Sequence, residues 1–482
     1  MALPRLKASP PDPRRAAARP GADLRRRARA RRARQHHPRL PPRMRGLLRY
    51  ATITPFALPF PARAAGCASP VPQDVPMSLS ARAPRAARFP LWLLVCASLT
   101  ALGPLSIDMY LPSFPALAAD LGVDIGRVQL TLGTFLVGLA AGQAFYGPIS
   151  DRFGRKPPLY AGLALYAAAA AGCALARDVE ALMLWRFLQA LGGCAGMVMA
   201  RAVIRDRLEA HESARAFSSL MLVMGLAPIL APIIGGAVLG VFGWRAIFWL
   251  LCGASLLILL VVHRYMEESL DHASAMPLRL GRVLSNYGEL LRDRGFVGYS
   301  LSAGCAQAGM FAYIAGSPFV LIELHGIAPS HYGFVFGTNA LGLIAMSQVN
   351  ARLVRNRALD HVLRGALLAP CAAGVMLAAV ALAGTAPLPV LLAGFFVFIG
   401  SLGCILPNAS ALAMAHQGHR AGTASALMGT LQFSLGTLAG AAVSVWRDGT
   451  ALPLAVVMAV CGIGAVGMRL VGRAGMQAQR PA

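Results

Sequence analysis

The sequence predicts an all-α membrane protein with twelve transmembrane helices in two six-helix halves. Of its 482 residues, 56% are apolar and only 13% are charged, and the mean hydropathy is +0.58. Soluble domains carry about 25% charged residues. The apolar residues also occur in runs of about 20, the length that spans a bilayer as a helix. These observations exclude a soluble enzyme.

The positive charge of the chain is concentrated at its N-terminus. Residues 1–76 hold 17 Lys and Arg against three acids, so they carry 14 of the 25 excess positive charges. This Arg-, Pro- and Ala-rich composition cannot bury a core, so residues 1–88 are predicted to be a disordered extension. An Arg-rich arm can bind nucleic acid or anionic lipid. We favour a solvated tail, or a true start near Met77, and expect no nucleic-acid partner.

Twelve apolar segments follow the extension. They are 89–111, 127–147, 157–176, 180–204, 216–240, 244–266, 295–322, 331–353, 361–383, 387–413, 421–446 and 451–472. The first six cover 89–266 and the last six cover 295–472, two blocks of equal length. A polar, charge-rich loop at 267–294 separates them, and residues 473–482 form a tail. The chain is therefore predicted to contain two six-helix bundles.

The basic residues of the short loops predict the orientation. Loops on the N-terminal side carry most of the Arg and Lys, whereas the opposite loops hold few, among them Arg127, Arg177, Arg245 and Arg447. Cytoplasmic loops carry the excess of basic residues. Both termini are therefore expected in the cytoplasm, in a multi-pass protein.

No metal, nucleotide or enzyme site is expected. The nine cysteines are scattered singly with no CxxC pair, and none of the ten His lies in the middle of a span. The chain has no G-x-x-x-x-G-K-[ST] phosphate-binding loop, and no Ser/His, His/Glu or paired-Asp constellation lies in the spans. A cofactor is therefore not predicted, and the chain is not predicted to be an enzyme.

Two ionisable residues inside the spans are candidates for function, because such residues cost about 2.5–3.5 kcal/mol on insertion scales. Asp108 lies roughly 28 Å from the inner end of the first span, and Arg186 roughly 9 Å from the outer start of the fourth. At this similar depth they can share one cavity. A carboxyl group in an apolar cavity can hold a proton and release it when a cation or water enters, which makes Asp108 a candidate proton carrier.

Both residues also have simpler interpretations. Asp108 can be an interfacial residue that ends the helix ahead of Pro112 and Pro115, and Arg186 can extend its side chain to the outer headgroups. Depth alone leaves both alternatives open.

A polar segment, Gly147-Pro-Ile-Ser-Asp151-Arg152-Phe-Gly154-Arg155-Lys156, lies between the second and third spans. Its two glycines permit a tight turn with close helix approach, and its acid can accept a hydrogen bond from a helix N-terminus or from an arginine. Its basic residues hold the loop at the inner face.

The fifth span contains Gly225-Leu-Ala-Pro228-Ile-Leu-Ala-Pro232-Ile-Ile-Gly235-Gly236. Each proline removes a backbone donor and bends the helix, and the paired glycines allow a neighbour to pack closely. The segment is either a kinked packing helix or a bend that shapes a cavity.

These motifs together resemble the major facilitator superfamily. The 147–156 segment resembles its loop-2/3 signature, Arg186-Phe-Leu-Gln189-Ala-Leu-Gly192 resembles its span-4 arginine motif, and the 225–236 segment resembles the span-5 motif of drug:proton antiporters. Ala190 and Ala231 stand where the general motifs have Gly, which weakens only the match to those general motifs.

Three further strings resemble the Bcr/CflA branch of this superfamily. They lie at 108–115 in span 1, at 313–320 in span 7 and at 339–352 in span 8, and the resemblance covers 89–472. It implies an inner-membrane, proton-coupled multidrug efflux transporter that exchanges bicyclomycin-, chloramphenicol- and sulfonamide-type drugs for protons by alternating access. Such a protein is expected to be a monomer, driven by the proton gradient, with its substrate site near the midplane between the halves.

The resemblance also implies roles for individual residues. Asp108 would be the proton- and substrate-coupled acid, and Arg186 would bias its protonation. A conformational latch between spans 2 and 11 would comprise Gly147, Asp151, Arg152, Gly154, Arg155 and Lys156. The expected cavity residues are Met109, Tyr110, Gln189, Gln307, Tyr313, Asn339 and Asn408, although the polar ones can instead bond between helices.

Two other functions fit the same sequence. The first is export of a metabolite such as an amino acid, peptide or sugar, for which the Gln and Asn side chains would supply hydrogen bonds. The second is a membrane receptor or scaffold that transports nothing.

Overall fold

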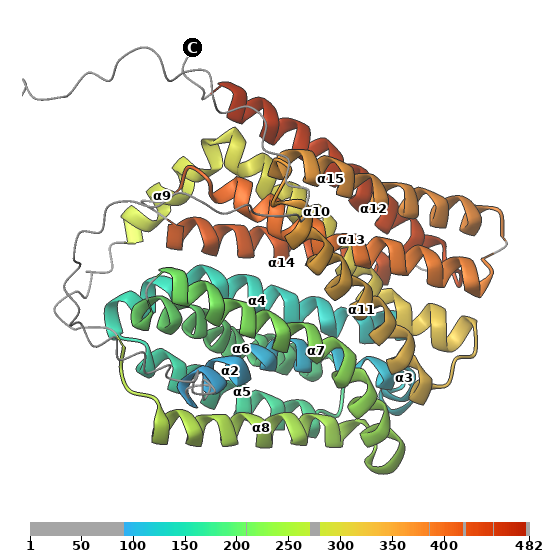
Figure 1. Ribbon diagram of the computed structural model, residues 1–482. Helices are drawn as coiled ribbons and strands as arrows, with labels where there is room; N and C mark the ends of the chain where they lie inside the picture. The colour runs from blue at the N-terminus through green and yellow to red at the C-terminus, as the bar shows by residue number, and fades with distance from the viewer. Residues whose placement is uncertain are drawn as a thin grey trace, which may run out of the picture. The chain divides into compact units, whose positions relative to one another are not determined.

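The computed structural model describes the membrane part of the chain (Figure 1). It covers residues 91–208, 210–269, 280–384, 386–417, 421–446 and 448–478. The predicted extension at 1–88 and its candidate start at Met77 lie outside these residues. Within the described ranges all regular structure is helical, which confirms the all-α class.

The helices of the N-terminal half begin where polar residues can cap them. Asp124 accepts a hydrogen bond from Arg127 N at 3.0 Å, and Asp178 accepts one from Ala181 N at 2.7 Å. These caps satisfy backbone donors that have no partner inside the helix. The elements are α2 (Leu91–Asp108), η1 (Leu111–Ser113), α3 (Phe114–Leu121), α4 (Ile125–Phe153), α5 (Lys156–Leu175), α6 (Val179–Arg207), α7 (Ala210–Phe242) and α8 (Trp244–Tyr265).

The C-terminal half repeats this layout. Asp293 caps its first long helix by accepting from Gly295 N at 2.9 Å and Phe296 N at 3.1 Å. The elements are α9 (Leu280–Arg292), α10 (Arg294–Pro318), the π-helical turn η3 (Phe319–Leu324), α11 (Pro329–Leu353), α12 (Leu359–Leu382), α13 (Leu388–Met414), α14 (Ala421–Val445) and α15 (Leu452–Ala478).

The two halves pack along two helix pairs. In Figure 1 most helices of the first half, blue to green, lie below those of the second half, yellow to red. The pairs α4–α14 and α7–α11 join the halves, whereas the other extensive contacts lie within one half. The predicted two-half arrangement therefore matches the observed packing.

Eleven helical segments of the described chain are long and apolar enough to cross a membrane. The predicted span at 331–353 is α11, which is long enough but carries Asn339, Gln348 and Asn350. On α8, Leu257 and Leu260 are 61% and 63% exposed, as suits a helix that faces lipid. The chain is a multi-pass membrane protein.

Three boundaries differ from the predicted ones. Residues 147–153 continue α4 instead of forming a loop, so the turn between spans 2 and 3 consists of Gly154 and Arg155 alone. The central loop contains α9, because apolar residues recur at helical spacing among its charges. The last helix continues into the predicted tail as far as Ala478.

A close contact joins α7 to the end of α2. The helix α7 is continuous through Pro228 and Pro232. A Cβ atom placed on Gly235 would lie 1.8 Å from the carbonyl oxygen of Met109, and one on Gly236 would lie 3.2 Å from the carbonyl oxygen of Pro329 in α11. The predicted close packing at the paired glycines is therefore present. It places α7 against the end of α2 in its own half and against α11 of the other half.

We expect Gly235→Ala to lower the thermal midpoint of the purified protein in detergent, because the new methyl group meets backbone that cannot rotate away. Overpacking of this kind costs about 1–3 kcal/mol. The matched control is Gly240→Ala in the same helix, since a Cβ atom there meets nothing within 4 Å. Equal midpoints for the two variants would show that the contact with Met109 is not tight.

Candidate functional site

The first span is interrupted at Asp108. Helix α2 ends at this residue, and a short connection leads into η1, which begins at Leu111 ahead of Pro112. Asp108 therefore ends the helix, as the simpler interpretation predicts. It does not lie at an interface with water, because it is only 3% exposed. It is the only acidic side chain that is buried in the described part of the chain.

Arg186 on α6 is enclosed within the N-terminal half. Its side chain is 0% exposed, which rules out an extension to the headgroups. The guanidinium carbon lies 4.2 Å from the ring centroids of both Tyr110 and Phe135, so two aromatic faces enclose the charge. A cation held against aromatic rings away from water gains about 2 kcal/mol from each favourable contact.

The hydrogen bonds of Arg186 go to neutral groups. Nη1 donates to Oε1 of Gln189 at 2.7 Å, and Nη2 donates to the carbonyl oxygen of Ser106 at 2.9 Å. The last four carbonyl groups of a helix have no partner inside it, and Ser106 is one of them. Nε of Arg186 and Nε2 of Gln189 have no hydrogen-bond partner. Arg186 therefore supports the end of α2.

Arg186 and Asp108 are linked through the backbone. Ser106 lies two residues before Asp108, so the hydrogen bond from Arg186 fixes the last turn of α2, which carries the carboxyl group of Asp108. Among the described side chains, no ion pair joins Arg186 to an acid. Their sharing of one cavity stays a prediction.

Aromatic and hydroxyl side chains of the C-terminal half form a group, which we call the aromatic cluster, within electrostatic range of Asp108. The phenol groups of Tyr313 and Tyr332 lie within electrostatic range of its carboxyl group. Asn339 Nδ2 donates to Tyr313 Oη at 2.7 Å, and the hydroxyl groups of Ser317 and Tyr332 are 2.8 Å apart. The cluster comprises Tyr313, Ser317, Tyr332, Phe336, Asn339 and Phe395.

The seven expected cavity residues occupy separate places. Tyr110 and Gln189 pack around Arg186, and Met109 lies at the α7 contact. Tyr313 and Asn339 belong to the aromatic cluster. Asn408 Nδ2 donates to Oδ1 of Asn350 at 2.7 Å between α13 and α11, and Gln307 is half-buried on α10. Asn339 and Asn408 thus bond between helices, whereas Gln189 bonds within α6.

Arg155 is the centre of the predicted latch. Its Nε donates to Asp206 at 2.9 Å, and its Nη1 donates to Asp151 at 2.6 Å and to Ser150 Oγ at 2.7 Å. Burial alone would lower the pKa of Arg155, but the hydrogen bonds to Asp206 and Asp151 outweigh it, so this pKa lies above its ordinary value. Asp206 comes from α6, and nothing in the sequence spacing indicated it.

A second acid absent from the prediction, Glu268, caps α5. Its carboxylate accepts from Arg155 N at 2.8 Å and from Lys156 N at 3.0 Å. An acid at a helix N-terminus is favourable because of the helix dipole. Gly154 makes room for it: its φ is +88°, and a Cβ atom there would lie 2.8 Å from the carboxylate. Gly147 lies inside α4 with nothing within 4 Å of a Cβ position.

Of the other two basic latch residues, Arg152 is exposed and Lys156 is half-buried. The Arg152 guanidinium lies over the ring of Phe153 at 5.1 Å, and Lys156 Nζ lies over the ring of Tyr160 at 5.6 Å. In the described residues, the Arg155 side chain bonds to α4 and α6, the backbone N–H groups of Arg155 and Lys156 bond to Glu268, and no hydrogen bond joins a latch residue to α14.

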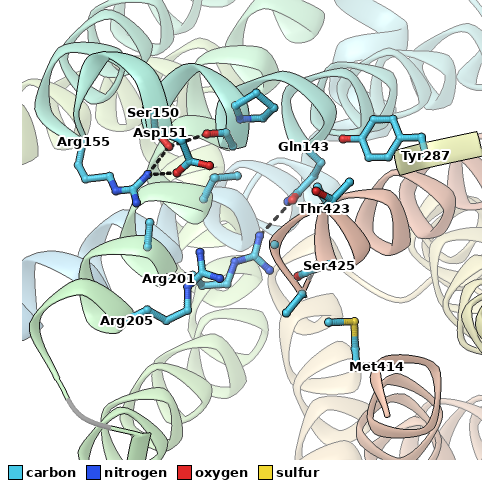
Figure 2. Close-up of a pocket in the computed structure, with 17 residues that line it drawn as sticks. Gln143, Ser150, Asp151, Arg155, Arg201, Arg205, Tyr287, Met414, Thr423 and Ser425 are labelled. Atoms are coloured by element: carbon cyan, nitrogen blue, oxygen red, sulfur yellow. Dashed lines mark hydrogen bonds and ion pairs between the residues drawn. The ribbon is translucent and has the colours of Figure 1, made fainter. Parts of the chain in front are cut away.

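A cavity of about 580 Å³ separates the latch from α14 (Figure 2). Its walls come from α4, α6, α9, α13 and the first turns of α14. At the opposite end the halves meet closely, because Gly236 of α7 contacts Pro329 of α11 and Gly333 of α11 contacts Ile233 of α7. The seam between the halves is therefore open at the Arg155 end and closed beside Asp108.

Comparison with known proteins agrees with this architecture. Residues 96–441 match the sequence profile of the Major Facilitator Superfamily. The chain is 37% identical over 370 residues to "Uncharacterized MFS-type transporter YdgK" of Bacillus subtilis, covering 76% of this chain and 91% of that one. It is 33% identical over 371 residues to "Bicyclomycin resistance protein homolog" of Haemophilus influenzae, covering 77% and 93%. It is 30% identical over 248 residues to "Multidrug resistance protein MdtL" of Escherichia coli, covering 51% and 62%.

Solved structures share the fold. The D-xylose-proton symporter superposes with a TM-score of 0.64 at 15% identity, covering 79% of this chain and 96% of that one. A bacterial homologue of the human lysosomal transporter Spinster, in an inward-facing and occupied conformation, gives a TM-score of 0.61 at 16% identity, covering 81% and 98%. At these identities the likeness shows the fold alone.

We expect Arg186→Lys to lower the thermal midpoint, because an ammonium group cannot reach Ser106 and Gln189 together while lying between two rings. Hydrogen bonds of charged groups contribute about 1.5–3 kcal/mol each. Arg127→Lys, at an exposed arginine that pairs with Glu180, is the control and should leave the midpoint unchanged. A midpoint for Arg186→Lys equal to that of the control would show that charge alone suffices.

The two latch glycines should differ in their tolerance of a side chain. Gly154→Ala is expected to lower the free energy of unfolding by about 1–3 kcal/mol, because its backbone conformation is one that essentially only glycine adopts. Gly147→Ala should be neutral or slightly stabilising, since Ala is favoured over Gly in a helix by about 0.5–1 kcal/mol. Thermal unfolding of both variants measures this, and an equal loss in both would be the contrary result.

Proposed function

Because this chain belongs to the Major Facilitator Superfamily, we propose that it exports hydrophobic drugs in exchange for protons by alternating access. As a member of that family it is a multi-pass transporter and not an enzyme. The proposal includes the proton gradient as the only source of energy, no bound cofactor, and a monomer as the working form. It places the protein in the inner membrane with the Arg155 end in the cytoplasm, since cytoplasmic loops are rich in basic residues.

The observation that carries the proposal is the position of Asp108. It is the one buried acid of the described chain, and it lies where the two halves meet. A buried carboxyl group is stable when protonated and becomes costly when charged, unless donors or water reach it. Asn339 donates to Tyr313 Oη at 2.7 Å and so holds this phenol group within electrostatic range of Asp108.

The two ends of the seam suggest how exchange would proceed. In the observed state the Arg155 end is open and the end beside Asp108 is closed by α7 and α11. Rocking of the halves would part this contact, expose Asp108 to the outside and allow it to take up a proton. Return to the observed state would carry that proton inward, where substrate or water entering from the cavity would release it.

The relatives support drugs as the substrate class. Two of them are named for bicyclomycin and multidrug resistance. The aromatic cluster offers Phe336 and Phe395 with a few polar groups, a combination typical of sites for small hydrophobic ligands.

A second candidate is export of a polar metabolite such as an amino acid. The hydrogen-bonded groups of Tyr313, Asn339, Ser317 and Tyr332 favour it, since a polar substrate needs several fixed partners. Proton exchange driven by cysteine but by no drug would select this candidate.

We expect Asp108→Asn to abolish drug:proton exchange. In everted vesicles energised by respiration, florfenicol, bicyclomycin or sulfathiazole should collapse the pH gradient with the wild type, and at least about tenfold less with the variant, because a group that cannot ionise carries no proton. A fluorescent ΔpH probe reports the exchange, and immunoblotting confirms insertion.

The control is Asp120→Asn, which removes an exposed acid on α3, in the same helical segment Leu91–Leu121 as Asp108. It should exchange protons like the wild type. Full exchange by Asp108→Asn would assign the proton to another group, and no response of the wild type to any compound would reject drug:proton exchange.

A further inference from the structure

Two arginines of α6 line the 580 Å³ cavity without an acid to neutralise them. Nη2 of Arg201 donates to Oε1 of Gln143 at 3.1 Å, and this neutral amide is its partner in Figure 2. Arg205 is exposed to the cavity. No ion pair involves either residue in the part of the chain that is described.

Among the lining residues, the charges of Arg155 and Asp151 cancel. Arg155 binds Asp151 and Asp206, and Asp151 is the only acid among the lining residues. The charge of Arg155 is therefore already balanced, and Arg201 with Arg205 leaves the cavity positive. The sequence analysis did not single out Arg201, since a basic residue near the end of a span resembles an ordinary cytoplasmic charge.

The two arginines also repel each other. They are four residues apart, which places them on one face of α6 about 6 Å apart along the axis, within electrostatic range. Like charges at this spacing destabilise a helix. An anion bound between them would remove the repulsion.

The opposite wall supplies further donors. It is formed by the first residues of α14, including Thr423 and Ser425, whose hydroxyl groups can donate hydrogen bonds. The N-terminal end of a helix carries a partial positive charge and free N–H groups. Figure 2 shows this wall across the cavity from Arg201.

We infer that Arg201 and Arg205 bind the acidic group of a transported substrate as it enters the open cavity. Arginine is suited to carboxylates and similar oxyanions because its planar donors match their geometry. The cavity lies between the halves and has the volume of a small-molecule pocket, about 300–1,000 Å³. This inference rests on the proposed export function and narrows its substrates to neutral and acidic compounds, because organic cations would be repelled.

Binding is tested on the full chain in phosphatidylcholine nanodiscs with 4-fluorobenzoate and its neutral analogue 4-fluorobenzamide, followed by ¹⁹F NMR titration. The wild type should bind the acid at least about tenfold more tightly than the amide. Arg201→Gln and Arg205→Gln should each weaken binding of the acid by about tenfold, the effect of losing one charge-assisted hydrogen bond. Arg201→Lys should keep part of the affinity.

The matched control is Arg355→Gln, which removes an exposed charge at the end of α11 outside the cavity. It should bind the acid like the wild type. Wild-type affinity for the acid in both Arg201→Gln and Arg205→Gln would overturn the site. A loss of affinity in Arg355→Gln as large as in the cavity variants would overturn it as well. Arg205→Gln alters an exposed side chain, so it tests the site even where Arg201→Gln does not fold.

A lipid headgroup could supply the same chemistry, so a second arm adds phosphatidylglycerol to the nanodiscs. Unchanged binding of 4-fluorobenzoate supports a soluble substrate. Loss of that binding in the wild type would assign the site to lipid and overturn the assignment to substrate.

Transport separates this inference from the proposed function. In vesicles, Arg201→Gln should reduce proton exchange driven by the weak acid sulfathiazole by about tenfold relative to exchange driven by neutral florfenicol. An equal reduction of the exchange driven by sulfathiazole and by florfenicol would overturn the role of Arg201 in selecting acidic substrates. Binding of 4-fluorobenzoate by a wild type that exchanges no protons would reject the antiport and retain the anion site.

Discussion

The hydrogen bond from Arg186 to the carbonyl oxygen of Ser106 fixes the point where the first helix stops. A helix end buried in a protein needs partners for its last carbonyl groups, and in a membrane no water is available to supply them. The arginine supplies one, and the rings of Tyr110 and Phe135 enclose its charge. The position of Asp108, its approach to the aromatic cluster and the contact of Met109 with α7 all follow from this interrupted helix.

At the other end of the molecule, acids organise the chain around one turn. Asp206 and Asp151 hold the side chain of Arg155, and Glu268 holds the backbone that follows it. Arg155 itself is buried, so without these acids its charge would have no partner. The turn between α4 and α5 is therefore tied to α6 and to the start of the central loop.

The sequence predicts the helices well because a bilayer requires long apolar runs, and each predicted span corresponds to a helix. It also indicates Asp108 and Arg186, since buried charge is rare in a membrane. It does not indicate that Arg186 bonds to Gln189 and the carbonyl oxygen of Ser106, since these partners are set by the packing of α6 against α2. The roles of Asp206 and Glu268 could not be predicted, because these residues are distant from Arg155 in the sequence and contact it only in the folded chain. Helix α9 was not predicted because its apolar residues are few and lie among charged ones.

The contact between Gly235 and Met109 has an evolutionary consequence. Two backbones meet there with no side chain between them, so no substitution at Gly235 can be accommodated without moving the backbone. Substitutions of side chains must then arise elsewhere, in the walls of the cavity or in the rings of the aromatic cluster. Homologous chains are therefore expected to differ in those side chains while they keep glycine at the position of Gly235.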